Sequence, residues 1–312
     1  MLQIFFKLLP FFALIGCGYL AVRSGFLSTQ ANDHITKFVF YFALPAMLFE
    51  FSSRLPIQDI FDPAAALAYL CASLGVYLLV MTVARFRGNT VAEASIEAQC
   101  SVIGNAGFLA IPILINLFGE RAATPVLLAL SVDLIFFGSL IVAVITGSRE
   151  GRVSPLLLFT VLSGMFRNPM LMGIFTGLAW SVLDLPVPGP MHEFVSVLGA
   201  AATPCALFVI GGSLVAKSTE RLSVALWLSF AKLVLHPLAV AVSMLVVFSV
   251  DPFTAGVVIG VAAMPVAGNI YLLASHYRVA PQRASTAIFI STLISILTLT
   301  VALTMISKLT TG

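Results

Sequence analysis

Two apolar stretches, far apart along the chain, each combine asparagine, proline and glycine. The first reads IGNAGFLAIPIL and contains Asn105 and Pro112, and the second reads VAAMPVAGNIYLLA and contains Pro265 and Asn269. In a lipid bilayer, backbone groups that lose their helical partners are tolerated only where protein or a water-filled cavity covers them. Such interruptions in corresponding parts of two halves predict broken helices at a ligand site near the bilayer midplane.

The chemistry that these interruptions favour is the binding of an anion. The ends of a broken helix carry partial charges of about half a unit, positive at the N-terminus, where free amides can hold an anion. Asparagine adds neutral donors and acceptors that suit a carboxylate, and glycine lets two backbones cross closely. The alternative is a pair of proline kinks in which asparagines hydrogen-bond between packed helices. The predicted substrate-binding residues are Asn105, Gly107, Pro112, Pro265, Gly268 and Asn269.

A second constellation consists of ionisable residues inside apolar runs. Asp133 lies in LLALSVDLIFFGSL, Lys232 lies about eleven residues into another apolar run, and His236 follows Lys232 at i+4 on the same helical face. Charges at such depth are costly and mark functional sites. We expect Asp133, Lys232 and His236 to form a coupling or charge-balancing group. Two alternatives stay open: a static ion pair that locks two helices together, and a Lys232 that faces the substrate anion.

Glu97 and Gln99 lie near the start of the apolar run at 94–117 that contains the first of these stretches, where they predict either a water-filled entrance, with a possible cation site, or a simple membrane interface. Signatures of enzymes are missing, because the chain has no HExxH, no GxSxG and no P-loop. We therefore predict that it is not an enzyme and binds no metal or cofactor. Its cysteines show no metal-binding spacing and all fall within apolar runs: Cys17, Cys71, Cys100 and Cys205.

Composition fixes the elements that must position these residues. Sixty per cent of the 312 residues are hydrophobic and nine per cent are charged, which excludes an ordinary soluble domain. A membrane-spanning helix needs about 20 apolar residues. We predict an all-α integral membrane protein with ten such helices, at 4–22, 35–52, 64–84, 94–117, 122–146, 168–184, 193–216, 222–249, 252–277 and 284–307.

Basic residues orient these helices. Eleven of the sixteen Lys and Arg residues fall on the side that holds the loops after the odd-numbered helices. By the positive-inside rule that side is cytoplasmic, so both termini face the periplasm or the outside of an inner (plasma) membrane. The net charge of +3 therefore reflects orientation in the bilayer, and no nucleic-acid partner is expected.

The chain divides at its longest polar stretch. We expect a first five-helix repeat at 1–147, a cytoplasmic linker with an amphipathic helix at 148–167, and a second five-helix repeat at 168–312. Five helices on each side make the second repeat inverted relative to the first. Both repeats contain P-x-x-L-F, at 45–49 and at 204–208.

Three long motifs resemble the auxin efflux carrier family, which includes plant auxin exporters and bacterial permeases for malonate and related acids. They are NDHITKFVFYFALPAMLF, GNAGFLAIPILINLFG and MPVAGNIYLLASHYRVAPQRASTAIFISTLIS. The resemblance implies ten helices in two inverted repeats, with helices 4 and 9 crossing at proline, as in sodium/proton antiporters and bile-acid symporters. It implies a scaffold of helices 1, 2, 6 and 7, often dimeric, and a moving transport domain of helices 3–5 and 8–10.

The resemblance also suggests roles for single residues. Asn105 takes the position of the asparagine that contacts carboxylate substrate in the plant carriers, whereas Asn269 stands where those carriers have a second proline. The identity of the substrate therefore does not transfer directly. The related antiporters carry an acid on helix 5 and a lysine on helix 8, which is similar to Asp133 and Lys232.

The function expected from the sequence is secondary transport of a small organic anion by an elevator-type movement. The anion would be a carboxylate such as malonate or an auxin-like acid, and the possible coupling ions are H⁺ and Na⁺. A homodimer through the scaffold helices is expected. The alternatives are a sodium-coupled organic-acid symporter resembling bile-acid transporters, with Glu97 among the cation ligands, and a ligand-sensing membrane receptor.

Overall fold

The computed structural model describes residues 2–54, 62–150, 166, 168–215 and 222–311. Within these ranges the backbone is helical apart from connecting turns and one isolated β-bridge. The first half contains α1 (Leu2–Arg23), α2 (Thr29–Phe38), η1 (Val39–Ala43), α3 (Leu44–Arg54), α5 (Pro63–Phe86), α6 (Val91–Val102), η2 (Ala106–Ala110), α7 (Ile111–Phe118), η3 (Glu120–Ala122), α8 (Ala123–Val132), η4 (Asp133–Phe137) and α9 (Gly138–Glu150). The second half contains α11 (Pro169–Val182), α12 (Gly189–Ala200), α13 (Ala202–Leu214), α14 (Leu222–Phe230), η5 (Ala231–Leu235), α15 (His236–Val242), η6 (Ser243–Val247), α16 (Pro252–Ala262), α17 (Asn269–His276) and α18 (Pro281–Thr311).

The helices have the length and composition of an integral membrane protein. Within the described residues, seven are long and apolar enough to cross a bilayer: Ile4–Arg23, Thr29–Arg54, Pro63–Phe86, Glu120–Ser148, Gly189–Leu214, Leu222–Val247 and Pro281–Lys308. Three shorter apolar helices accompany them, Ala106–Phe118, Pro169–Val182 and Pro252–Ala262. The fold is thus an all-helical membrane protein, and the count of ten spans stays a prediction. The predicted linker helix lies, apart from its ends, outside the described residues.

Short π-helical turns precede three prolines inside long helices. The turns η1, η2 and η5 each end two residues before a proline, which is Pro45, Pro112 and Pro237 respectively. Proline lacks an N–H group, and its ring clashes with the carbonyl four residues earlier in a regular α-helix. A wider π turn relieves that clash and lets the helix continue. Pro237 therefore sets the local geometry of Lys232, which lies in η5.

Among the described residues, helical geometry is interrupted inside two of the predicted spans, 94–117 and 252–277, and the two interruptions are in contact. The helix α6 ends at Val102 and η2 begins at Ala106, while α16 ends at Ala262 and α17 begins at Asn269. The intervening segments form an antiparallel bridge between Gly104 and Val266. Pro265 adjoins this bridge. Pro112, which the resemblance puts at the crossing, lies instead in α7, because η2 has already accommodated its ring.

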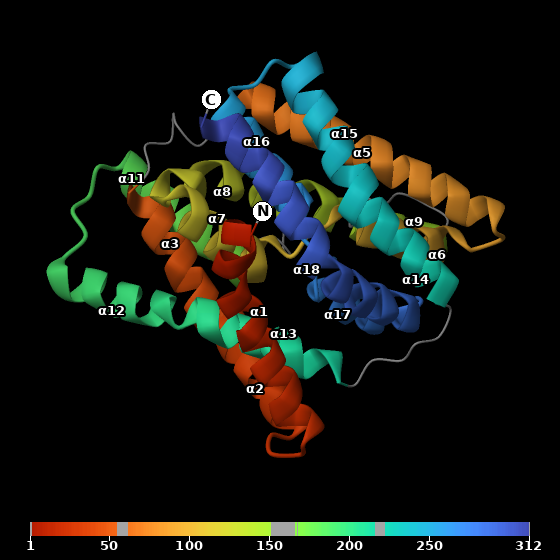
Figure 1. The fold of residues 1–312 in the computed structure, drawn as a ribbon, viewed down its shortest axis with the longest axis horizontal. Helices are drawn as coiled ribbons and strands as arrows, with labels where there is room; N and C mark the ends of the chain where they lie inside the picture. Colours follow the sequence, from red (N-terminus) through yellow and green to blue (C-terminus); the bar gives the residue numbers. More distant parts are fainter. Residues whose placement is uncertain (1, 55–61, 151–165, 167, 216–221, 312) are drawn as a thin grey trace.

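Two groups of helices can be distinguished in Figure 1. In the first group α1 packs on α13, and α3 packs on α11 and α12; these are the red and green helices. In the second group α5 packs on α6 and α15, and α18 packs on α14 and α16; these are the orange, teal and blue helices. The turn η2 contacts α13 of the first group and α8, which packs on α16 of the second. The bridge between the interrupted helices is therefore close to the boundary between the two groups.

Glycine permits the closest helix contacts of the first group. A Cβ atom added to Gly18 in α1 would lie 1.8 Å from the carbonyl oxygen of Phe208, and one added to Gly211 in α13 would lie 1.8 Å from that of Ile15. A Cβ at Gly173 in α11 would lie 2.6 Å from the carbonyl oxygen of Pro45 in α3. Small residues allow such backbone contact in membrane helices. The pairs α1–α13 and α3–α11 are thus held by backbone packing.

Gly18→Ala is expected to lower the thermal stability of the purified protein, because the methyl group would overlap a neighbouring backbone. Overpacking costs about 1–3 kcal/mol. Gly16→Ala on the same helix is the matched control, since a Cβ at Gly16 meets nothing within 4 Å. The measurement is the midpoint of thermal unfolding in detergent for both variants. Equal midpoints would contradict this account of the α1–α13 contact.

Candidate functional site

A cavity of about 250 Å³ lies where the interrupted helices meet. Its wall combines residues of both interruptions with residues of α8, η4 and α9, and with residues of the first helix group. The lining residues used below are Phe40, Gln99, Asn105, Gly107, Phe108, Asp133, Asn168, Met170, Gly268, Asn269 and Ile270. Phe40 belongs to η1, and Asn168 immediately precedes α11. The cavity therefore touches both groups of helices.

The structure brings together four of the six predicted substrate-binding residues. Asn105, Gly107, Gly268 and Asn269 line the cavity. Asn105 is buried, whereas Gly268 and Asn269 are exposed. The two remaining residues, Pro112 and Pro265, are outside the wall that the described residues form, and they act on the backbone.

The carbonyl ends of the broken helices have partners. The amide of Ala267 donates to the carbonyl of Ile103 over 3.1 Å, and the amide of Asn105 donates to that of Pro265 over 2.9 Å. The ammonium group of Lys232 donates to the carbonyl of Ala262, the last residue of α16. A cation at the C-terminus of a helix is favourable because the helix dipole is negative there. The negative ends of both broken helices are thereby satisfied next to the crossing.

The amide ends, by contrast, are open to the cavity. No side chain caps η2, and the amides of Gly107 and Phe108 have no hydrogen-bond partner among the described residues. Both residues line the cavity. At the start of α17 the amides of Ile270 and Tyr271 donate to the carbonyls of Ala267 and Gly268, so the unpaired amides among the described residues there are those of Gly268 and Asn269, which also line the cavity. Each helix N-terminus carries about half a positive charge. Two positive ends facing one cavity make a site for an anion.

Lys232 lies behind the crossing. Its side chain is fully buried, and its Nζ atom would be 3.3 Å from a Cβ atom added to Gly104. That added Cβ would also lie 3.0 Å from the carbonyl oxygen of Val261, so glycine is needed for both close approaches. Lys232 therefore contributes positive charge from beyond the wall and is not among the described lining residues.

His236 orients the lysine. Its Nδ1 atom lies 3.2 Å from Lys232 Nζ and its Nε2 atom lies 2.9 Å from the hydroxyl of Ser73. A charged lysine can only donate, so Nδ1 accepts and the proton of the neutral ring is on Nε2, which donates to Ser73. The predicted pair at i and i+4 is thus in direct contact, and a serine of α5 extends it.

Asp133 lines the cavity and is almost fully buried. Its Oδ1 atom accepts a hydrogen bond of 2.9 Å from the hydroxyl of Tyr69, whose ring centroid lies 5.9 Å from that of His236. Its Oδ2 atom has no partner among the described residues. Asp133 and Lys232 interact electrostatically, but each hydrogen-bonds to other groups.

Gln99 reaches the same cavity from α6. Its Nε2 atom donates to the carbonyl of Phe137 over 3.3 Å. Its Oε1 atom is buried and lacks a partner in the described part of the chain. A carbonyl oxygen can only accept, so the contact with Phe137 fixes which way the amide points. Gln99 therefore adds a second buried acceptor without a donor to the wall.

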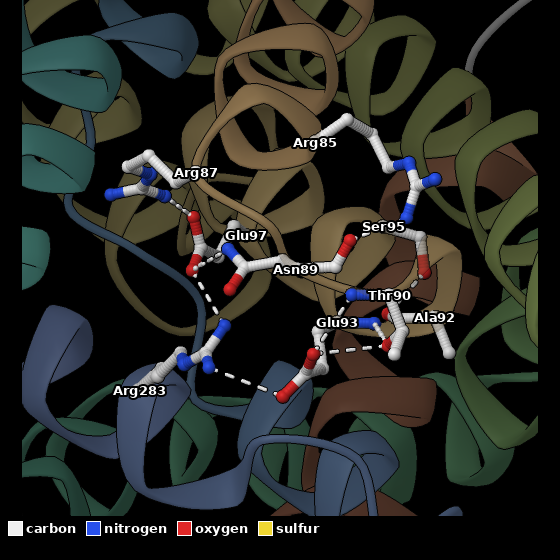
Figure 2. A network of polar contacts seen from close by, with 9 residues as sticks. All are labelled: Arg85, Arg87, Asn89, Thr90, Ala92, Glu93, Ser95, Glu97 and Arg283. Carbon is white, nitrogen blue, oxygen red and sulfur yellow. Dashed lines mark hydrogen bonds and ion pairs between the residues drawn. The ribbon is translucent and has the colours of Figure 1, made fainter.

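Glu97 is fully buried and lies outside the cavity wall, in the polar network of Figure 2. Its Oε1 atom accepts hydrogen bonds of 2.9 Å from Arg283 and 3.1 Å from Asn89, and its Oε2 atom pairs with Arg87. Arg283 also bonds to Glu93 over 3.1 Å. The residue predicted for an entrance or a cation site is thus held by two guanidinium groups.

The same network caps the N-terminus of α6, the helix that contains Gln99. The hydroxyl of Thr90 accepts from the amide of Glu93 over 3.2 Å, and the carboxylate of Glu93 accepts from the amide of Thr90 over 2.9 Å. This reciprocal capping box satisfies orphan amides at the N-terminus of α6. Since Glu93 also binds Arg283, the start of α6 is tied to the start of α18 (Figure 2).

Sequence reasoning missed Tyr69, Ser73 and Arg283 as parts of the site. The signal for Tyr69 and Ser73 was present, because both are polar groups within the apolar run of α5 at the i, i+4 spacing of one helical face. Arg283 could be counted only as a basic loop residue. Its pairing with Glu97 joins positions 186 residues apart, which no local pattern reveals.

Comparison with known proteins identifies membrane transport proteins as relatives of this chain. A family model described as membrane transport protein matches residues 3–303. The chain is 30% identical over 298 residues to a protein of Rhizobium meliloti (strain 1021) named "Putative malonate transporter", covering 94% of this chain and 92% of the relative. It is 24% identical over 304 residues to "Uncharacterized transporter YfdV" of Escherichia coli (strain K12), covering 92% of each.

These matches extend over nearly the whole chain, including both interrupted helices and every residue of the cavity wall. They confirm the resemblance drawn from the three long motifs. The chain belongs to the membrane transport protein family, which includes the auxin efflux carriers.

Proposed function

We propose that this chain is a secondary transporter of a small carboxylate, such as malonate, across the inner membrane. The observation that carries the proposal is the pairing of two open helix N-termini at one cavity, while the carbonyl ends beside them are satisfied. Such a site attracts an anion without a lysine or arginine in its wall. A relative that is 30% identical bears malonate in its name, which makes malonate the first substrate to test.

We propose an elevator-type movement for this transport. Ten spans in two inverted repeats would give a scaffold of helices 1, 2, 6 and 7, which corresponds to the first helix group, and a transport domain that contains the crossing. Two features support this division. The scaffold pairs are held by glycine-mediated backbone contacts, and the cavity wall includes Phe40 and Asn168 from the scaffold side. In this proposal two copies form a homodimer through the scaffold. Both termini of each copy lie on the periplasmic side.

A proton is the coupling ion that the buried polar groups favour. Asp133, Tyr69, His236 and Lys232 form a continuous set of buried groups that begins at the cavity. The sodium-coupled alternative requires the carboxylate oxygens of Glu97 as cation ligands, but these oxygens already form ion pairs with Arg87 and Arg283. If protons are coupled through Asp133, Asp133→Asn removes the dependence of flux on a pH gradient for a monocarboxylate, whose own charge does not change near neutral pH. A flux that collapses when sodium is replaced by choline would favour the symporter.

The test of transport is flux in reconstituted vesicles. Purified full-length protein is inserted into liposomes, and uptake of labelled malonate, succinate and indole acetate is compared with protein-free liposomes. We expect saturable, protein-dependent uptake of at least one acid. Absence of flux for every carboxylate, with folded protein in the vesicles, would overturn the proposal.

Asn105→Ala is expected to weaken carboxylate binding. A hydrogen bond to a charged group contributes about 1.5–3 kcal/mol, or roughly a 10- to 150-fold change in affinity. The matched control is Asn116→Ala in α7, because Asn116 is exposed and is not among the described lining residues. The measurement is the half-saturation constant for uptake by each variant. Equal constants for both variants would remove Asn105 from the substrate site.

A further inference from the structure

We propose that the cavity selects a carboxylate carrying one negative charge together with a hydrogen-bond donor, such as the monoprotonated form of a short dicarboxylic acid. The inference rests on the proposed transport function and specifies the protonation state of its substrate. Two independent observations carry it: the net charge around the cavity and the excess of acceptors in its wall.

The charge around the cavity suits a single negative charge. Asp133 is the one acidic residue among the described lining residues, and no lysine, arginine or histidine is among them. Lys232 lies behind Gly104, where it donates to the carbonyl at the end of α16 and interacts electrostatically with Asp133. The positive groups that face the cavity directly are the two helix N-termini, each with about half a unit of charge, so no full positive charge in the described wall is available for a second carboxylate. A dianion would leave one charge uncompensated in a largely apolar enclosure, which is costly.

The wall also holds two acceptors that need a donor. Gln99 is 5% exposed and Asp133 is 4% exposed, and each keeps one buried oxygen without a partner among the described residues. A buried acceptor left unsatisfied costs about 1–3 kcal/mol. A fully ionised dicarboxylate brings acceptors only and cannot satisfy either oxygen. A monoprotonated one presents its carboxylate to the helix ends and its O–H group to this wall.

The described groups packed around Asp133 do not donate to its Oδ2 atom, so a ligand must supply that hydrogen bond. Tyr69 from α5 already donates to Oδ1, and Lys232 from η5 donates to the carbonyl of Ala262 and to His236. His236 from α15 lies against the ring of Tyr69 and bonds to Ser73. None of these donors is directed at Oδ2. The remaining space next to Asp133 is the cavity itself.

The experiment uses two malonate derivatives as competitors of labelled malonate uptake in vesicles with clamped membrane potential. Malonamate, the half-amide, is a monoanion with N–H donors, and monomethyl malonate, the half-ester, is a monoanion without a donor. We expect the half-amide to compete at least about tenfold better than the half-ester, as one charged hydrogen bond predicts. We expect its inhibition constant to stay constant with external pH. That of malonate should rise about tenfold per pH unit above its second pKa, because the competent fraction falls.

Two variants assign this selectivity to the wall. Gln99→Met keeps the length of the side chain and removes the acceptor, so the preference for the half-amide over the half-ester should fall about tenfold. Asp133→Asn keeps an acceptor for Tyr69 and turns the second oxygen into a donor, so the half-ester should gain relative to the half-amide. Gln282→Met, at an exposed glutamine of α18, is the matched control and should leave the ratio unchanged. Because the readout is a ratio, it does not depend on how much protein folds.

The outcomes separate this inference from the transport proposal. Flux without any preference between the two derivatives, or an inhibition constant of malonate that does not change with pH, overturns the inference and leaves transport standing. Absence of all carboxylate flux overturns the transport proposal and the inference with it. A ratio that is unchanged in both Gln99→Met and Asp133→Asn overturns the assignment to this wall.

Discussion

Lys232→Met is expected to reduce carboxylate flux by at least about a hundredfold, which corresponds to about 2.7 kcal/mol. The substitution leaves the carbonyl of Ala262 and the carboxylate of Asp133 buried without their cation. Removing one member of a buried charge pair costs about 3–5 kcal/mol. The positive potential behind the crossing disappears as well. The measurements are initial uptake rates in vesicles and the midpoint of thermal unfolding in detergent.

The double variant Asp133→Asn with Lys232→Met distinguishes charge balance from transport. It removes both charges together, so we expect it to regain most of the thermal stability that Lys232→Met loses. Flux should stay low, because the end of α16 remains without its cation. Normal flux in Lys232→Met would show that the lysine is dispensable. A double variant no more stable than Lys232→Met would show that the two charges do not compensate each other.

Arg283→Met is expected to destabilise the protein by about 3–5 kcal/mol, because Glu97 is fully buried and Arg283 is one of its two cationic partners. Arg87 would remain, but its side chain is 33% exposed, so water competes for it. The start of α18 would also lose its bond to Glu93. The measurement is the midpoint of thermal unfolding, with uptake recorded on the same preparation.

Arg85→Met provides the matched control for Arg283→Met. Arg85 is exposed and donates to the backbone carbonyl of Asn89 at the edge of the same network. Exposed charge contacts contribute about 0–1 kcal/mol, so its unfolding midpoint should stay near that of the unsubstituted protein. Adding Glu97→Gln to Arg283→Met should restore part of the lost stability, because the buried charge is then gone. Equal effects of Arg283→Met and Arg85→Met would contradict the importance of the buried pair.

Much of the site could be predicted because its polar and charged residues stand out within apolar runs of the sequence. Asn105, Asn269, Asp133 and Lys232 are polar or charged residues within apolar helices, where each has a cost that a sequence exposes directly. The structure gathers three of them around one cavity and puts Lys232 immediately behind it. The starts of α5 and α11 were also predictable, because each apolar run there begins at a proline.

The rest depends on contacts that no local pattern encodes. Pro112 looked like the break itself, yet a π turn absorbs its ring and the break occurs earlier, at Gly104. Glu97 looked like a free carboxylate because its partner Arg283 is distant in sequence. The orientation of the Gln99 amide follows only from its hydrogen bond to the carbonyl of Phe137. For Glu97 and Gln99 the deciding partner comes from another helix.

The bridge between Gly104 and Val266 has a consequence for how this site can change during evolution. Its hydrogen bonds join backbone atoms of Asn105 to Pro265 and of Ile103 to Ala267, so no side chain of the wall is needed to hold the two helices together. Substitutions of Asn105 or Asn269 can alter the ligand chemistry while the frame persists. The same arrangement of helices can thereby bind different acids, and a change of substrate requires no change of fold.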